Sequence, residues 1–280
     1  MNQEIRSTLC PNCRRLVSTD GSPCPYCGLP NPGSRWRNNF FTQGVLGGEN
    51  LTRSIIFVCV GMFVFSLLLN PSSTRFSMNP LSFLSPGSRS LILLGATGTL
   101  PIGDLHRWWT LLTANYLHGS ILHILFNMMA FRQIAPLVIQ EYGAYRTFSI
   151  FTLSGVGGYL VSYLAGISLT LGASAAICGL IGAALYYGKS RGGFFGQMVY
   201  QQLSGWVIGL FLFGFLFPGI DNWAHGGGLA FGVITGFLLG YQERTPETFF
   251  HKIVAAICLV ATLGALALAV ISALLISFRF

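Results

Sequence analysis

Seven long apolar segments constrain what this chain can fold into. They lie at roughly residues 54–69, 117–139, 146–167, 174–188, 198–217, 222–241 and 253–277. A helix that crosses a hydrocarbon core of about 30 Å needs around 20 residues. Only 9% of the 280 residues are charged, whereas a soluble protein carries roughly a quarter. We therefore predict an all-α polytopic membrane protein with seven transmembrane helices, whose main solvent is the lipid bilayer.

The formal net charge of +8 raises the question of nucleic-acid binding. The basic residues are spread thinly along the chain, so we expect no nucleic-acid partner and interpret the charge as an orientation signal. The first 50 residues are polar and show no signal peptide, which predicts a cytoplasmic N-terminus. In that orientation, twelve Lys and Arg residues lie on the cytoplasmic side of the membrane. This count includes Arg132, whose long side chain can reach the inner face. The four outside are Arg75, Arg89, Arg107 and Arg279. We expect the protein to lie in the bacterial inner membrane.

Residues 1–33 contain two CxxC pairs, Cys10/Cys13 and Cys24/Cys27, separated by ten residues. Four thiolates from two tight turns match tetrahedral zinc, and this spacing resembles a zinc ribbon. Two disulfides are the alternative, which a reducing cytoplasm disfavours. A site filled by four thiolates has no open position, so we predict a structural zinc that folds a small module and no cofactor for catalysis. The module's position suggests docking to a cytoplasmic partner. Residues 34–52 are predicted to be a linker.

The connection between the first two apolar segments, about residues 70–115, is unusually long. It contains several prolines and ends near Trp108 and Trp109. This apolar and aromatic content is too high for a disordered loop. We predict an ordered element on the membrane surface, with the tryptophans at headgroup level.

The fourth apolar segment is short. Ser174 to Gly188 is fifteen residues, or about 22 Å of helix, which is roughly 8 Å less than the hydrocarbon thickness. If its inner end lies near Lys189, Ser174 lies below the outer surface. The preceding turn, residues 171–173, is then irregular backbone at membrane depth, which requires a wet cavity or burial in protein. The structural alternative is that Ser174 only caps its helix.

A histidine lies at a similar depth in the sixth segment. His225 follows Asp221 by one turn, and ionisable residues within spans mark function. Glycines then recur every fourth residue, at 228, 232, 236 and 240, while the fourth segment carries Ala175, Gly179 and Ala183. Small residues at this spacing let helices meet backbone to backbone. We predict that the two ridges pack together and place Ser174 opposite His225.

This pair has the composition of an activated nucleophile, because a neutral imidazole can accept the serine proton. No carboxylate is placed to orient the imidazole, which favours a dyad over a triad. In the second segment, His123 and Asn127 are four residues apart and share a helix face. They are candidate oxyanion donors, together with backbone N–H groups at the start of the fourth helix. His118 lies about 140° around the same helix and is expected to face another neighbour.

Three motifs resemble the rhomboid family of intramembrane serine proteases. Gly172-Ala173-Ser174-Ala175 is similar to its GxSx motif, and the run from Ala224 to Gly228 followed by Gly232 is similar to its AHxGGxxxG. The run from His118 to Asn127 is similar to its second-helix signature. The resemblance covers roughly residues 53–242. It implies a six-helix catalytic core there, with residues 243–280 as one extra transmembrane helix (6+1).

The resemblance also implies roles for individual residues. Ser174 would be the nucleophile, His225 the general base, and His123 and Asn127 the oxyanion-hole donors. The activity implied is cleavage of other membrane proteins within or beside a transmembrane helix. The alternatives are a catalytically weak or inactive relative that binds membrane-protein clients, and a channel or transporter.

The chain departs from the family pattern at three places. Ala175 replaces a frequent glycine, Cys178 replaces an aromatic residue that often stacks on the catalytic histidine, and Trp109-Thr110 replaces a Trp-Arg pair, with Arg107 nearby. Each change is expected to affect rate or substrate choice, and none removes a reacting group.

Overall fold

The structure is a computed structural model that describes residues 7–11, 15–20, 23–26, 29, 31–34, 46, 48–76, 82–217 and 219–277. Seven helices of 18 residues or more dominate this part of the chain: α2 (Gly48–Leu69), α5 (Ile121–Tyr142), α6 (Ala144–Leu164), α7 (Ser174–Arg191), α8 (Gly193–Leu216), α9 (Asn222–Leu239) and α10 (Phe249–Ser277). Each corresponds to one predicted apolar segment. The prediction of a mostly helical membrane-protein fold is therefore confirmed.

Five of these helices, α2, α5, α6, α8 and α10, are long and apolar enough to cross a membrane. The chain is thus an integral membrane protein. α7 and α9 are shorter, at 18 residues each, and carry more polar or small residues. Most residues of α7 are buried against other helices, whereas α9 buries the face that carries its glycines and leaves an apolar face exposed.

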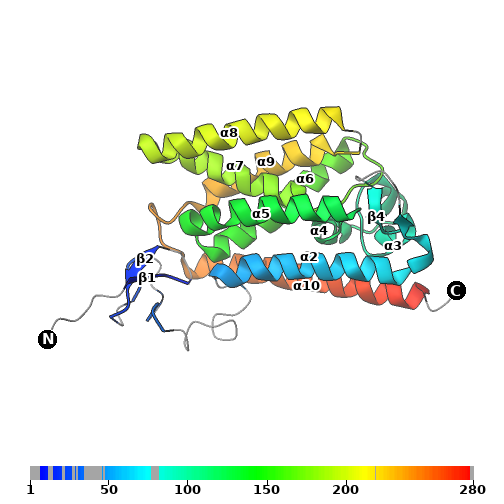
Figure 1. Cartoon of the computed structure of the whole chain (residues 1–280), viewed down its shortest axis with the longest axis horizontal. Helices are drawn as coiled ribbons and strands as arrows, with labels where there is room; N and C mark the ends of the chain where they lie inside the picture. Colours follow the sequence, from blue (N-terminus) through cyan, green and yellow to red (C-terminus); the bar gives the residue numbers. More distant parts are fainter. Residues whose placement is uncertain are drawn as a thin grey trace.

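The helices form a bundle with α7 at its centre, and α9 packs against α7 and α6 (Figure 1). α7 packs against α9, α6, α8 and α5. α8 lies along the upper edge in this view, while α2 and α10 lie side by side along the lower edge. α10 also packs against α6, so the seventh helix is part of the bundle and not a separate appendage. We call the end of the bundle where α2 begins and α5 and α7 finish the base of the bundle.

Several helices extend beyond the apolar segments. α2 begins at Gly48, so the last residues of the predicted linker are helical. α7 continues through Lys189 to Arg191, three residues beyond the expected end. Hydropathy marks the part of a helix that faces lipid, whereas polar turns continue the same backbone hydrogen bonding outside it.

The described part of the long connection after α2 is built from short elements, so the prediction that it is ordered is confirmed. They are η1 (Pro71–Ser73), β3 (Arg75–Phe76), β4 (Phe83–Ser85), α3 (Ser88–Leu93), η3 (Leu100–Asp104), α4 (Thr110–Thr113) and η4 (Ala114–Tyr116). β3 and β4 pair antiparallel. Trp108 is half exposed, and its ring meets that of Tyr163 edge-on at 5.5 Å. α3 and α4 both pack against α10, so this connection closes one end of the bundle.

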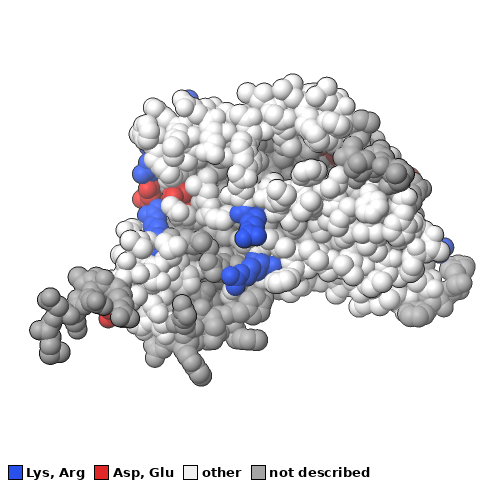
Figure 2. Space-filling view, in the orientation of Figure 1, with Lys and Arg blue, Asp and Glu red and all other residues white. Residues whose placement is uncertain are grey.

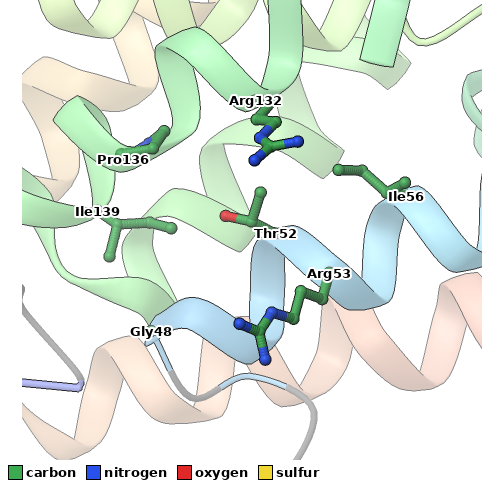
Figure 3. Close-up of a pocket in the computed structure, with 7 residues that line it drawn as sticks. All are labelled: Gly48, Thr52, Arg53, Ile56, Arg132, Pro136 and Ile139. Carbon is green, nitrogen blue, oxygen red and sulfur yellow. The ribbon is translucent and has the colours of Figure 1, made fainter. Parts of the chain in front are cut away.

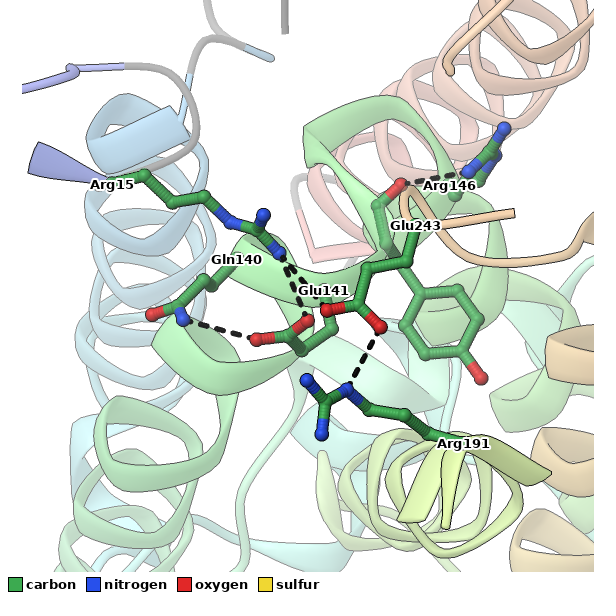
Figure 4. A network of polar contacts seen from close by, with 7 residues as sticks. Arg15, Gln140, Glu141, Arg146, Arg191 and Glu243 are labelled. Atoms are coloured by element: carbon green, nitrogen blue, oxygen red, sulfur yellow. Dashed lines mark hydrogen bonds and ion pairs between the residues drawn. The ribbon is translucent and has the colours of Figure 1, made fainter. Parts of the chain in front are cut away.

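The N-terminal module begins with an antiparallel hairpin of β1 (Ser7–Leu9) and β2 (Leu16–Ser18). Its arginine at position 15 reaches the base of the bundle (Figure 4). Arg15 lies 3.3 Å from the buried carboxylate of Glu141 and 4.0 Å from that of Glu243. Arg191 pairs with Glu243 at 2.8 Å. We call Arg15, Glu141, Arg191 and Glu243 the charged cluster. Acidic and basic atoms meet at the left edge of the space-filling view (Figure 2).

Candidate active site

Ser174 is the first residue of α7 and is half-buried. The N-cap position belongs to Ala173, and no side chain caps this helix. Ser174 therefore does not act as a helix cap, and its hydroxyl is not used for that purpose. The first N–H groups of any helix have no acceptor within the helix, so α7 begins with a hydroxyl next to backbone donors.

The turn before Ser174 is held from three sides. The Gly172 N–H donates to the Ala114 carbonyl at 2.9 Å. The Gly172 carbonyl accepts a hydrogen bond from the Tyr159 hydroxyl of α6. Two residues earlier, Thr170 exchanges backbone hydrogen bonds with Thr97. The connection between α2 and α5 thus supports the backbone that carries the serine.

His123 lies beside this turn, and two hydrogen bonds fix it. Its backbone N–H donates to Oγ of Ser120, the N-cap of α5, at 3.2 Å. Its Nδ1 accepts from the Gly119 N–H at 3.3 Å. A neutral imidazole that accepts at Nδ1 carries its proton on Nε2. A Cβ built on Gly172 would lie 2.6 Å from that Nε2 and 3.7 Å from Ser174 Oγ, so a donor and the hydroxyl flank one position.

Asn127 follows one turn later on α5 and is buried. Its Nδ2 donates to the His123 carbonyl at 2.9 Å. An amide nitrogen has two hydrogens, so one remains for another acceptor. The two residues occupy one face of α5, as their spacing predicted.

His118 does not face a separate neighbour, and that expectation is wrong. Its ring is fully buried and meets the His123 ring edge-on, with centroids 5.2 Å apart. Its two ring nitrogens have no hydrogen-bond partner within the described parts of the chain. The helical angle did not apply because α5 begins at Ile121, after His118.

His225 lies in the first turn of α9 and is buried. Asp221 is the N-cap of this helix: its Oδ1 accepts from the Ala224 N–H at 2.9 Å, and its Oδ2 accepts from the Ser162 hydroxyl. Both carboxylate oxygens are thus engaged away from the imidazole. His225 Nδ1 has no hydrogen-bond partner among the residues described.

The predicted ridge packing between α7 and α9 is confirmed. A Cβ on Gly228 would lie 2.1 Å from the Ala175 carbonyl oxygen, and one on Gly232 would lie 1.9 Å from that of Gly179. A Cβ on Gly236 would lie 3.0 Å from Ala183. Because Gly228 follows His225 by three residues and Ala175 follows Ser174, this register brings the serine and the histidine to one end of the bundle. Within the described residues, no hydrogen bond joins them.

A third helix contributes to this contact, which sequence reasoning missed. A Cβ on Gly158 of α6 would lie 2.6 Å from the Ala224 carbonyl oxygen and 3.1 Å from the Ala175 methyl. The extra methyl of Ala175 is accommodated because α6 has no side chain there. The run of small residues Ser154-Gly155-Val156-Gly157-Gly158 was the available signal. Cys178 is buried one turn after Ser174.

The Trp-Arg position of the outer connection also has a defined structure. The Thr110 hydroxyl is buried and donates to the Arg107 carbonyl at 2.7 Å. The Arg107 guanidinium donates to the Ile92 carbonyl at 3.5 Å. Arg107 therefore braces α3 from within this connection.

The predicted metal ligands are only partly within the described residues. Cys10 and Cys24 are buried in one small cluster with Val17. Their N–H groups donate to the carbonyls of Arg15 and Leu29, in each case five residues further on, so the two cysteines make the same backbone hydrogen bond. Cys13 and Cys27 lie outside the described residues.

Comparisons with known proteins agree with this geometry. The Rhomboid domain model matches residues 105–242. The chain is 32% identical over 222 residues to RHOMBOID-like protein 6, mitochondrial, of Arabidopsis thaliana, with 72% of each chain covered. It is 31% identical to RHOMBOID-like protein 1 of the same plant, covering 56% of that protein. It is 29% identical to Rhomboid protease GluP of Bacillus subtilis (strain 168), covering 75% of this chain and 39% of GluP.

The matched domain contains Ser174, His225 and the helices that bring them together. The similarity to RHOMBOID-like protein 6 extends well beyond that domain. The chain therefore belongs to the rhomboid family, a family of intramembrane proteases.

Proposed function

We propose that this protein is an intramembrane serine endopeptidase with a Ser174–His225 dyad. The observation that carries the proposal is the backbone contact between Gly228 and Ala175, where a Cβ would have only 2.1 Å. It fixes the register of α7 on α9 next to both reacting groups. A serine that does not cap its helix and a buried histidine without a carboxylate partner suit a dyad in which the imidazole is the base.

In the proposed mechanism, Ser174 Oγ attacks the scissile carbonyl carbon while His225 takes the hydroxyl proton. The carbonyl oxygen becomes an oxyanion, which accepts hydrogen bonds from His123 Nε2–H, the free Asn127 N–H and the first N–H groups of α7. Each such donor is worth about 3 kcal/mol of barrier lowering. The tetrahedral intermediate collapses, and His225 returns the proton to the leaving amine. Water then hydrolyses the acyl-enzyme by the same steps.

Transmembrane protein segments are the proposed substrates, because the reacting groups sit among helices that cross the membrane. We also propose that the base of the bundle faces the cytoplasm, in a bacterial inner membrane. The excess of Lys and Arg on the segments expected inside supports this orientation. In the 6+1 arrangement that we propose, α10 is the additional helix after the six of the core.

The test is cleavage of a model transmembrane substrate in detergent by wild type, Ser174→Ala and His225→Ala. Both variants should lose at least about 10³-fold in rate while keeping the wild-type melting temperature. Ser204→Ala is the matched control, since that hydroxyl on α8 is exposed and only bonds the Tyr200 carbonyl. Undiminished cleavage by either site variant contradicts the dyad. Folded wild type without activity favours the alternative, an inactive relative that binds membrane-protein clients.

We further propose that the N-terminal module is a zinc ribbon with Cys10, Cys13, Cys24 and Cys27 as ligands. The matching backbone hydrogen bonds at Cys10 and Cys24 support it, because each CxxC pair would present two thiolates to one metal. When bound, zinc would cross-link the module and would take no part in catalysis. Metal analysis of the full-length protein should give about one zinc per chain, and Cys10→Ser with Cys13→Ser should remove it. Equal zinc in Cys258→Ser, a buried thiol of α10, is the control. A metal-free wild type refutes the ribbon.

A further inference from the structure

A cavity of about 480 Å³ opens between α2 and α5 in the half of the bundle nearer the base. Its wall includes Thr52, Arg53 and Ile56 of α2 and Arg132, Pro136 and Ile139 of α5 (Figure 3). The cavity lies away from Ser174. The serine is near His123, which stands at the start of α5, the end of that helix farther from the base. The proposed protease chemistry makes no use of it.

Two arginines, Arg53 and Arg132, line this cavity, and none of the described residues lining it is acidic. Figure 3 shows the Arg132 side chain pointing from α5 toward Thr52, while the Arg53 side chain leaves the next position of α2 and lies on the side of that helix away from Arg132. Arg53 also has an interaction with another group of the protein. Positive side chains at a cavity wall attract an anion, and Arg132 adds its charge to that of Arg53 there.

The depth of Arg132 makes this arrangement unusual. It lies eleven residues after Ile121 and ten before Tyr142, in the middle of a helix that can cross a membrane. An exposed charge at that depth is costly unless its side chain reaches toward an interface or a partner. Arg132 shares its cavity with Thr52 and Arg53, which lie in the first turns of α2 and so in the half nearer the base.

Apolar surface leads away from both arginines in the other direction. On α2, the side chains of Phe57, Val60, Val64 and Leu68 follow Arg53 at helical spacing and are 72%, 41%, 46% and 67% exposed. On α5, Met129 and Leu125 precede Arg132 on the same face and are 58% and 49% exposed. The face thus carries positive charge near the base and a long apolar surface beyond it. Figure 2 shows basic side chains on an otherwise largely uncharged face.

We propose that this cavity binds the phosphate headgroup of an anionic phospholipid, whose acyl chains lie along the exposed stripes of α2 and α5. Basic pockets between transmembrane helices near an interface recognise anionic headgroups. The apolar stripes select a lipid over a free phosphate, because only a lipid covers them. The site takes its lipid from the leaflet at the base of the bundle.

The experiment measures lipid bound to the full-length protein in detergent by native mass spectrometry. The probes are phosphatidylglycerol and phosphatidylcholine with identical acyl chains, and glycerol 3-phosphate as the headgroup without chains. Wild type should retain phosphatidylglycerol selectively. Arg53→Gln with Arg132→Gln should weaken retention by about 30-fold, since each basic side chain near an anionic surface contributes about 1 kcal/mol and 1.4 kcal/mol is tenfold.

The matched control is Lys189→Gln with Lys252→Gln, which removes two exposed basic groups near the base but outside the cavity. It should retain phosphatidylglycerol within about twofold of wild type. Arg53→Lys with Arg132→Lys keeps the charge and should retain most of the binding, which separates charge loss from misfolding. Equal retention of the two lipids by wild type overturns the proposal. An equal loss of phosphatidylglycerol retention in the control variant also overturns it. So does binding of glycerol 3-phosphate as tight as that of the lipid.

Discussion

At the scale of single residues, the most constrained position of the site is Gly172. Its φ of +129° lies in a region that side chains rarely adopt, and the space for a Cβ is already taken by His123 Nε2 at 2.6 Å. Both conditions require glycine. The residue therefore couples the backbone conformation before Ser174 to the position of the imidazole across from it.

We predict that Gly172→Ala lowers the cleavage rate by about 10²-fold or more, because a displaced His123 no longer donates to the oxyanion. Gly166→Ala is the matched control: its φ is +83°, yet nothing lies within 4 Å of its Cβ position. Both variants should lose about 1–3 kcal/mol of stability from backbone strain, and Gly172→Ala somewhat more, because its methyl also meets His123. Cleavage and melting temperature distinguish the two effects. Equal activity in the two variants would remove His123 from the proposed oxyanion hole.

The sequence identifies reacting groups better than the residues that hold them. Ser174, His225, His123 and Asn127 were found from motif and spacing. Tyr159 and Gly158 were not, because a tyrosine and a glycine inside an apolar helix show no sign of the atom they will meet on another helix. His118 was misplaced for a local reason: the helical period was applied to a residue that precedes the helix.

At the scale of elements, the contact between α7 and α9 was predictable to the residue. The repeat of small residues sets the face of each helix, and matching the two repeats sets the register. The backbone oxygens of Ala175 and Gly179 lie where Cβ atoms at Gly228 and Gly232 would be. The ends of the helices were less predictable, because polar turns such as residues 189–191 continue beyond the apolar segment.

We predict that Gly232→Ala destabilises the protein by about 1–3 kcal/mol, since its methyl would fall 1.9 Å from the Gly179 carbonyl oxygen and push α9 away from α7. Cleavage should fall as well, because the displacement separates Ser174 from His225. Gly209→Ala on α8 is the control, with nothing within 4 Å of its Cβ position. It should leave activity unchanged and match or exceed wild-type stability. A Gly232→Ala variant that melts like Gly209→Ala would contradict the tight contact.

At the scale of the whole molecule, the N-terminal module and the helical bundle share the charged cluster. Glu141 is 2% exposed at the end of α5, and Arg15, 126 residues earlier, supplies the nearest described cation. Gln140 donates a second hydrogen bond to the same carboxylate at 3.0 Å. No sequence pattern pointed to this pairing, because each residue alone resembles an ordinary charge at the end of a segment. The Arg15 carbonyl also accepts the hydrogen bond from the Cys10 N–H. Arg15 therefore takes part both in the proposed metal site and in the contact between the N-terminal module and the bundle.

We predict that Arg15→Ala destabilises the full-length protein by about 1–3 kcal/mol, because it leaves a buried carboxylate without its cation. Adding Glu141→Gln should recover part of this loss, so the double variant is less destabilised than the sum of the singles. Arg244→Ala is the control, an arginine at the same end that stacks on the Tyr241 ring at 5.0 Å, and should cost no more than about 0.5 kcal/mol. A zinc chelator should lower the melting temperature of wild type more than that of Arg15→Ala, since only wild type has the contact between the module and the bundle to lose. Additive single variants, or equal chelator effects, would mean that the module and the bundle fold independently.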